Sequence, residues 1–561
     1  MATSFLICWF GSVTILASDY YKIDRATISG DSEMKLSKQA FFSAFLVLNL
    51  ALTCYSSAQQ TAVAEAPEIQ AIIDEGRNNS QVQDHLDYLT NRIGPRLTGS
   101  EGLQAGCEWA RDRFEEMGLN NSRLEQWGEV AVGFERGPAS GRMIEPKSLN
   151  LNFGTNSWTA GTKGRVVGNA LMAPKTMEEL ESMRAELKGA YVFTPRSVRG
   201  MRGGGGRRGG GARGQNPGEG AGGAAQPETK EAETKTDEEK AAEAAKAEQA
   251  RLDAEKAAAE QAVQSAIREE LLKIGVAGLI QPTADDLIVT GGSFRIEWDK
   301  LPTTPIISLQ KAQYDEIQEL ITSGEKVSLG FDIRNHFRKG PIELNNVIAD
   351  IPGTEFPDEY VIVGGHIDSW DGASGATDNG AGCATTMEAA RILMATGAKP
   401  RRTIRFMLWS GEEQGLLGSM AYVAKHPEEM AKISTVLVHD GGTNYVAGIR
   451  GTKLMTEDFE KIFAPATRLD ERAPFEVGTT DAIVPRGGSD HVSFIQAGVP
   501  GFFWEQQGRA VYRNTHHTQY DTYDSVVPEY QMHSSIVIAI GAYGIANLDY
   551  LLPRDGVQTG R

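Results

Sequence analysis

The sequence is poor in cysteine and in positive charge. Its 561 residues include 4 cysteines, and Lys and Arg (56) are outnumbered by Asp and Glu (74), which gives a net charge of −18. So few cysteines exclude a disulfide scaffold. The acidic balance argues against a general nucleic-acid binder, although acidity by itself mainly serves solubility. A chain of this length is too long for one hydrophobic core, so we expect two or three domains.

Long apolar runs are also scarce, and they lie near the N-terminus. Residues 34–38 carry lysines, residues 40–53 are mostly apolar, and residues 56–58 are small, a pattern typical of a secretory signal. We therefore interpret residues 1–58 as a leader, with translation starting at Met34, and expect an exported chain, periplasmic or secreted, without a stable membrane span. The alternatives are a longer leader or anchor that includes residues 5–17, or a lipoprotein, which is disfavoured because no small residue directly precedes Cys54.

Residues 59–140 form the first part of the main domain. The spacing of apolar residues from 82 to 118 predicts two helices, joined by a loop that contains Arg96 and Ser100. We favour a capped helix start for this loop over a place in an active site. Cys107 and Cys383 both lie in helix-like contexts, and we interpret them as small buried hydrophobic residues.

Residues 141–340 differ from the rest. Short β-like runs surround helix-like stretches at 177–187 and 310–321, which predicts an inserted α+β module. It lacks a tight cluster of His, Cys, Asp and Glu, so we expect it to cover or shape a substrate site. Its low-complexity part, residues 196–272, is rich in Gly and Arg at first and in Ala, Glu and Lys later, which predicts a flexible stretch followed by an exposed helix. RNA binding by the arginine–glycine run is disfavoured in an exported acidic chain.

Residues 341–561 repeat a strand–loop–helix pattern. Candidate strands are residues 360–363, 403–409, 434–439 and 500–504, and candidate helices are residues 383–394, 416–425 and 528–551. The pattern predicts an α/β domain with a doubly wound, mostly parallel sheet. Such sheets bind their ligands at the carboxyl ends of the strands.

Residue types that bind metals follow the first of these strands. His366 and Asp368 are two residues apart, so in extended backbone they project to the same side, where the carboxylate can hold the imidazole in one tautomer. Asp378 follows a loop of small residues and precedes a predicted helix. We expect its carboxylate to lie near the N-terminus of that helix.

Further carboxylates and imidazoles follow the later strands. Glu412 and Glu413 come after the second strand and Asp440 after the third, while His516 and His517 lie closer to the C-terminus. Adjacent carboxylates cannot aim at one point in the same way, so one of the two glutamates can bind a metal while the other acts as a base. Singly, such residues usually cap helices or satisfy polar groups. Imidazoles with several carboxylates and no thiolate are a ligand set suited to zinc.

These motifs resemble those of the co-catalytic dizinc exopeptidases, the family that includes bacterial leucine aminopeptidases, glutamate carboxypeptidase and carboxypeptidase Q. The resemblance is carried by residues 364–382, 411–415, 440 and 517–522, and the segments 402–405 and 496–501 are most similar to the carboxypeptidase Q type. It covers roughly residues 66–195 and 273–554. It also implies that residues 141–340 are an insert of the protease-associated type.

The resemblance implies two zinc ions held by five side chains: Asp378 between both ions, Glu413 and His517 on one, and His366 and Asp440 on the other. It makes Glu412 the general base and Asp368 the carboxylate that orients a ligand, and it leaves His516 as a neighbour of the site. The zinc ions would polarise the scissile carbonyl and activate water, so no serine nucleophile is needed.

The expected function is hydrolysis of dipeptides or short peptides. A receptor-like relative without catalysis and a cyclase-like transferase with one zinc are disfavoured because no ligand is missing. Spare carboxylates such as Asp371, Asp490 and Glu505 favour recognition of a free α-amine. Cations near the catalytic loops leave recognition of the C-terminal carboxylate open: Arg486, Arg509 and Arg513. We expect a peptide substrate and no nucleic acid, and the assembly state stays open, a homodimer included.

Overall fold

The computed structural model describes residues 66–196 and 237–560. The signal at residues 34–58 and the Gly- and Arg-rich stretch at residues 199–223 lie outside the described residues, so both remain predictions. No helix in the described ranges is both long and apolar enough to cross a membrane.

The main sheet contains the four strands that the sequence predicted. They are β9 (Phe356–His366), β10 (Arg402–Trp409), β11 (Ile433–Val438) and β14 (Gly501–Phe503), which run parallel in the order β14-β11-β9-β10. Next to β10 lies β8 (Ser328–Ile351), which pairs with it in the antiparallel sense. The fold is therefore a mixed α/β fold around a large mixed sheet.

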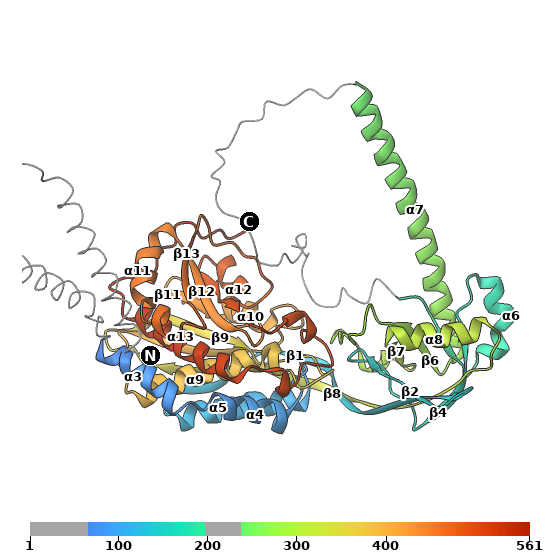
Figure 1. Cartoon of the computed structure of the whole chain (residues 1–561), viewed down its shortest axis with the longest axis horizontal. Helices are drawn as coiled ribbons and strands as arrows, with labels where there is room; N and C mark the ends of the chain where they lie inside the picture. The colour runs from blue at the N-terminus through green and yellow to red at the C-terminus, as the bar shows by residue number, and fades with distance from the viewer. Residues whose placement is uncertain (1–65, 197–236, 561) are drawn as a thin grey trace, which may run out of the picture. The chain divides into compact units, whose positions relative to one another are not determined.

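Helices cover both faces of these strands (Figure 1). Val361 and Val363 of β9 pack in one cluster with α9 (Ala381–Ala395) and α13 (Pro528–Ala546). Ile362, between them, packs in a second cluster with α10 (Leu417–Lys425) and α12 (His491–Gln496). Since side chains alternate across a strand, a strand that is buried on both faces reads as a continuous apolar run. The strands around β9 are thus wound on both faces, as predicted.

The N-terminal helices pack on the same sheet. The two predicted between residues 82 and 118 are α4 (Val82–Asp87), continued by η1 (Tyr88–Ile93), and α5 (Glu101–Glu116). The Ser100 side chain accepts a hydrogen bond from the amide of Leu103 and caps α5, as predicted. An additional helix, α3 (Pro67–Asn78), precedes them. Cys107 and Cys383 are buried free thiols, which confirms their interpretation as small core residues.

A long strand that the sequence did not reveal, β1 (Asn120–Glu145), pairs with β8 along its whole length. Its sequence contains Gly128, Gly133, Gly137 and Gly141, and the pairing register shifts at several points. Each such bulge breaks the alternation of buried and exposed side chains. The period of two that marks a strand is therefore lost from the sequence of β1.

The chain between β1 and β8 forms the inserted module (Figure 1). Its elements are β2 (Leu149–Asn150), β3 (Phe153–Thr155), β4 (Val166–Met172), α6 (Met177–Leu187), β5 (Tyr191–Phe193), α7 (Asp237–Ile274), β6 (Gly278–Pro282), η3 (Trp298–Lys300), β7 (Ile306–Leu309) and α8 (Lys311–Thr322). It has hydrophobic clusters of its own, yet β4 pairs with β8, so the module shares one sheet with the main domain. Its division at residues 141 and 340 and its protease-associated type remain predictions.

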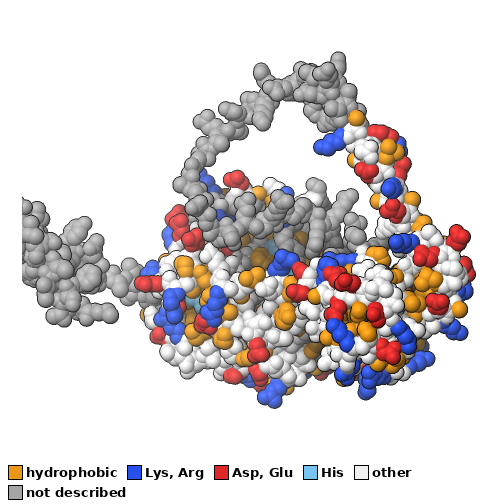
Figure 2. Space-filling view, turned by 45° about the vertical axis from the view of Figure 1, so that its right-hand side comes forward, with side chains coloured by type: hydrophobic (Ala, Val, Ile, Leu, Met, Phe, Trp, Pro, Cys, Tyr) orange, Lys and Arg blue, Asp and Glu red, His pale blue; other side chains and the backbone are white. Residues whose placement is uncertain are grey.

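Helix α7 confirms the predicted exposed helix from residue 237 onward. Its side chains are exposed from residue 248 to residue 266, with acidic and basic residues mixed along it (Figure 2). Ile267 and Leu271, near its C-terminus, are buried in a cluster with Leu180 of α6. Among the described side chains of α7, those of the last turns therefore anchor the helix in the module.

The remaining elements extend the C-terminal half. A second sheet has the order β13-β12-β15, formed by β12 (Tyr445–Thr452), β13 (Glu476–Thr480) and β15 (Glu505–Gln507), and α11 (Lys453–Phe463) packs on it. Short helical turns are η4 (Ala376–Gly380), η5 (Ala466–Arg468), η6 (Tyr512–Asn514) and η7 (Tyr523–Ser525). Turn η4 precedes α9, and η6 and η7 flank the loop that carries His517.

Candidate metal centre

The site lies where three parallel strands end together. His366, the last residue of β9, is the ladder partner of Trp409, the last residue of β10, and β11 ends two residues earlier in the ladder, at Val438 beside Gly364. The carboxylates of the predicted site follow these strand ends within a few residues. This is the edge at which α/β sheets bind ligands, as the sequence predicted.

Asp378 stands between two histidines. Its Oδ1 lies 3.3 Å from Nε2 of His366, and its Oδ2 lies 3.2 Å from Nε2 of His517. The same Nε2 of His366 also lies 3.0 Å from Oδ1 of Asp440. Nε2 of His517 likewise lies 3.0 Å from Oε2 of Glu413. The five predicted ligands therefore form one continuous cluster with Asp378 at its centre.

The donor atoms of this cluster fit a metal better than they fit each other. Oε1 of Glu413 is buried and receives no hydrogen bond. Buried polar atoms are normally paired, so such an orphan acceptor needs a cation or another partner. Two groups within the described residues bring three donor atoms close together, one with His366, Asp378 and Asp440 and the other with Asp378, His516 and His517.

The charges of the cluster compensate one another without a metal. Burial raises the pKa of Glu413 to about 7, against the opposing charge of His517. Burial lowers the pKa of His517, but the charge of Glu413 and the hydrogen bond to Asp378 outweigh it and raise that pKa to about 11. Burial also raises the pKa of Asp378, yet hydrogen bonds from His366 and His517 hold it well below its usual range. A metal would replace these imidazole protons, because a ligand histidine must be neutral.

Asp368 holds parts of the site in place. Its fully buried carboxylate accepts hydrogen bonds from Oγ1 of Thr98 at 2.9 Å and from the amides of Glu412 at 3.1 Å and Glu413 at 3.4 Å. Nδ1 of His366 lies 2.9 Å from the carbonyl oxygen of Asp368 and 3.6 Å from its carboxylate. The backbone of Asp368 thus orients the imidazole, whereas its carboxylate fixes the turn with the two glutamates.

The side chains of Glu412 and Glu413 point in different directions, as expected for adjacent residues. Glu413 is buried and reaches His517, whereas Glu412 keeps part of its surface exposed. Burial raises the pKa of Glu412 well above its usual range, against the opposing charge of His366. The hydroxyl of Ser410 is held between Nε1 of Trp127 and the carbonyl of Asn345, at 2.8 Å from each. No nucleophilic role is left for it.

A third imidazole lies beside the cluster. The ring of His516 is stacked on that of His517, with centroids 3.8 Å apart, and its Nε2 lies 3.9 Å from Oδ2 of Asp378. The Trp370 ring stands edge-on to His517 at 5.9 Å. His516 is thus a close neighbour of the site, in the place that the sequence pattern indicated.

Arg96 was assigned to a loop start, but it lies inside the protein against the site. Its guanidinium is fully buried and donates hydrogen bonds to the carbonyls of Ile367 at 2.7 Å, Ser374 at 3.0 Å and Gly375 at 2.8 Å. These carbonyls belong to the loop that connects His366 to Asp378. The signal was present as a lone arginine between glycines, but a loop arginine is ordinarily exposed.

The carboxylates expected to receive an amine differ in their availability. Asp371 is buried, and its Oδ1 accepts hydrogen bonds from Arg136 at 2.8 Å and Ser157 at 2.6 Å, whereas its Oδ2 has no partner. Glu505 pairs with Arg450. Asp490 is buried, and burial raises its pKa to about 7 against the opposing charge of His366. Of the three, Asp490 is thus the one whose charge is coupled to the cluster.

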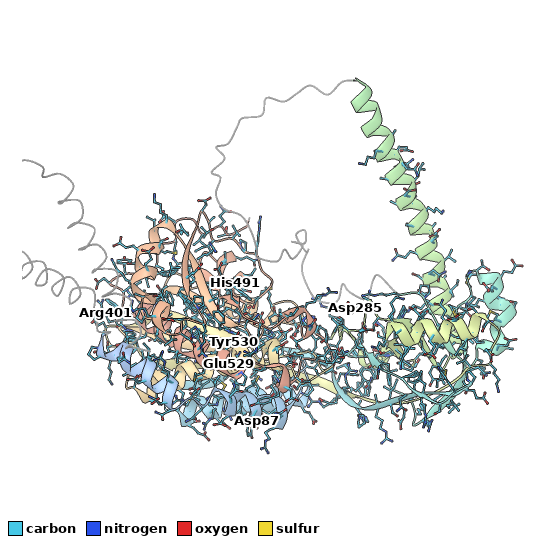
Figure 3. The ribbon with its side chains drawn as sticks, viewed as in Figure 1. Asp87, Asp285, Arg401, His491, Glu529 and Tyr530 are labelled. Carbon is cyan, nitrogen blue, oxygen red and sulfur yellow. The ribbon has the colours of Figure 1, made fainter. Side chains whose placement is uncertain are left out.

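Two of the expected cations are paired. Arg509 pairs with Glu529 at 2.7 Å, and Arg513 pairs with Asp285 at 2.9 Å; both acids are labelled in Figure 3. All four side chains are well exposed. A substrate carboxylate would therefore have to compete with an existing partner at either arginine.

Comparison with known proteins identifies the class. Residues 346–540 match the model of Peptidase family M28. A crystal structure of a peptidase M28 precursor from Shewanella amazonensis shares the fold, with a TM-score of 0.56 at 22% identity over 86% of this chain and 97% of that one.

A resemblance to carboxypeptidase Q extends over most of the chain. Carboxypeptidase Q of Mus musculus is 26% identical over 482 residues, which cover 85% of this chain and 88% of the relative. A probable glutamate carboxypeptidase of Arabidopsis thaliana is 32% identical over 226 residues, 37% of this chain and 32% of that protein. The family resemblance inferred from the motifs is thus confirmed.

Proposed function

We propose that the chain is a zinc-dependent exopeptidase that binds two metal ions and cleaves dipeptides or short peptides. One observation carries the proposal: Asp378 directs one carboxylate oxygen to each of two histidines, and each histidine contacts a further carboxylate. A carboxylate that serves two ions leaves two further ligands for each, and five side chains meet that need. The names of the relatives, carboxypeptidase Q and glutamate carboxypeptidase, support an exopeptidase.

Each residue of the cluster has a separate task in this proposal. His366 and Asp440 would hold one zinc ion, His517 and Glu413 the other, and Asp378 both. When bound, the ions would polarise the scissile carbonyl and make water more acidic. Glu412 would accept a proton from the attacking water and pass it to the leaving amine. Asp368 would keep Glu412 in reach, because it binds the backbone of the turn.

We propose that the free α-amine of the substrate is recognised close to the metals. The cluster contains three carboxylates, and such an acidic site favours an ammonium group over a carboxylate. A carboxypeptidase that reads the far carboxylate is the second candidate, supported by the names of the relatives. The exported location expected from residues 34–58 is part of the same proposal.

A panel of matched dipeptides tests the function. We expect the purified chain to contain about two zinc ions and to cleave unblocked dipeptides, with a strong loss of kcat/KM on N-acetylation and a smaller loss on C-terminal amidation. Equal cleavage of acetylated and free dipeptides would replace amine recognition by the carboxypeptidase alternative. A chain that binds no metal and cleaves none of the panel would refute the exopeptidase itself.

A further inference from the structure

One segment of the inserted module lies against the loop that carries His517. Residues 285–294, between β6 and η3, are called the clamp segment here. The amide of Thr290 donates a hydrogen bond of 2.8 Å to the carbonyl oxygen of His517, and Val289 forms an antiparallel bridge with Thr518. The contact is therefore made with the backbone of a predicted metal ligand itself.

The side chain of Gln519 ties the clamp segment to the same loop a second time. Its Oε1 accepts a hydrogen bond from the amide of Ile288 at 2.8 Å, and its Nε2 donates one to the carbonyl of Asp286 at 3.2 Å. The exposed pair of Arg513 and Asp285 lies next to these bonds in the sequence, but exposed ion pairs contribute little. Gln519 is thus the side chain that carries this link.

The clamp segment also touches two other loops of the candidate metal centre. The amide of Phe294 donates to Oε1 of Gln414, the residue after Glu413, at 3.4 Å. Thr290 is buried, with 4% of its surface exposed, and a Cβ added to Gly372 would lie 1.9 Å from its Oγ1, so the loop after Asp371 packs directly against it. One short segment of the insert therefore contacts the loops next to three of the ligands.

The backbone conformation of His517 depends on contacts with other segments more than that of the other candidate ligands does. Its φ is +61°, in the left-handed region that residues with a Cβ rarely adopt. Such a conformation costs of order 1–3 kcal/mol and persists only where the surroundings enforce it. The residue lies in a loop, and 28% of its side chain is exposed. The hydrogen bonds from Thr290 and through Gln519 hold the backbone around His517 in place, as the pairing of β9 with its neighbouring strands does for His366.

We propose that the clamp segment is a positioning element of the metal centre: the inserted module fixes His517, and with it one of the two metal positions. The inference rests on the proposed function, because it needs the metals to be there. It goes further in assigning the insert a role in metal retention, where the sequence had suggested only covering or shaping of the substrate site.

A pair of glutamine variants tests the proposal. Gln519→Ala removes the two side-chain hydrogen bonds to the clamp segment and leaves the backbone contacts of Val289 and Thr290 in place, and Gln313→Ala is its matched control. Gln313 bonds two backbone groups within the module in the same way, the amide of Asn152 at 2.7 Å and the carbonyl of Asn150 at 2.9 Å, away from the metal loops. The rate at which zinc passes to an excess of chelator is measured for each ion, together with thermal unfolding.

We expect Gln519→Ala to release one of the two ions roughly 10-fold faster or more, as loss of a group that orients a ligand typically does, and the other ion at the unmodified rate. Gln313→Ala should release both at the unmodified rate. Gln519→Glu keeps the acceptor for Ile288 and should fall between; it serves alone if the alanine variant does not fold. Unchanged release in the Gln519 variants, or equal acceleration of both ions, overturns the proposal. An unmodified chain without bound metal refutes the proposed function instead.

Discussion

The two ends of the candidate metal centre differ in how the chain holds them. His366 closes a strand that is buried on both faces, its side chain is 1% exposed, and Arg96 binds the backbone that follows it. His517 sits in a loop, in left-handed backbone, and is held by a segment from the inserted module. The same ligand type is thus supported from within the sheet at one end and from a separate module at the other. We therefore expect the two metal positions to differ in how readily they lose their ions.

Asp378 belongs to both ends, so changing it should have the largest effect. In Asp378→Asn we expect both ions to be lost and hydrolysis to fall to background, because each ion loses a ligand and the charge that balances it. Metal analysis and dipeptide turnover measure this. Asp371→Asn is the control, since Asp371 is a nearby buried aspartate bonded to Arg136, and it should keep both ions. Full metal content in Asp378→Asn would contradict the bridging role.

The adjacent glutamates should separate chemistry from binding. In Glu412→Gln we expect both ions and substrate affinity to be kept while kcat falls by roughly 100- to 10,000-fold, the usual contribution of a general base. Glu413→Gln should instead lose the ion at the His517 end. Metal content beside kcat and KM distinguishes the two, and the reverse pattern would exchange the two roles.

Arg96 supports the His366 end, and its loss should reduce stability. Arg96→Met leaves several buried carbonyls without donors, which we expect to cost on the order of 3 kcal/mol in the free energy of unfolding. Denaturant unfolding of the metal-free chain measures this. Arg334→Met, which removes an exposed arginine paired with Asp332, is the control and should stay within about 0.5 kcal/mol. Equal stability of both variants would show that Arg96 does not hold the loop.

The smallest effect on activity is expected from a deletion that is remote from both ends of the candidate metal centre. Deletion of residues 199–260 removes the low-complexity stretch and the exposed part of α7 but keeps Ile267 and Leu271, which anchor the helix. We expect kcat/KM for dipeptides to change less than about twofold, because no described residue in the deleted range contacts the metal loops. Loss of folding would show that this stretch belongs to the core of the module.

The sequence revealed the strand ends and the candidate ligands around them because both leave local signals. Val361 to Val363 form an apolar run, and polar residues follow at once, so strand and site could be read together. The pairing of Asp378 with both histidines is long-range, and the sequence indicated it only through the family resemblance. The helix α9 was evident from its periodicity, while β1 was hidden by glycines and register shifts.

The parts that sequence reasoning missed depend on contacts between distant segments. Arg96 looked like a loop residue because nothing near it in the sequence shows that three carbonyls of the 367–375 segment surround it. Asp371 looked like a free carboxylate because Arg136 lies on the unrecognised strand β1. The clamp segment contains no chemically reactive cluster, so its contact with His517 is visible only in three dimensions.

The pairing of β1 with β8 determines where this chain tolerates a change of length. Glu145 and Ser328 are ladder partners, so the module leaves and rejoins the sheet at neighbouring points, and its span is closed by hydrogen bonds whatever its length. Doubling a flexible loop costs only about 0.6 kcal/mol in closure entropy. Insertions into loops of the module that leave the pairing of β1 with β8 intact are therefore expected to cost little stability. Between Ile288 and Phe294, one added residue would move the backbone donors out of register with the loops they bind.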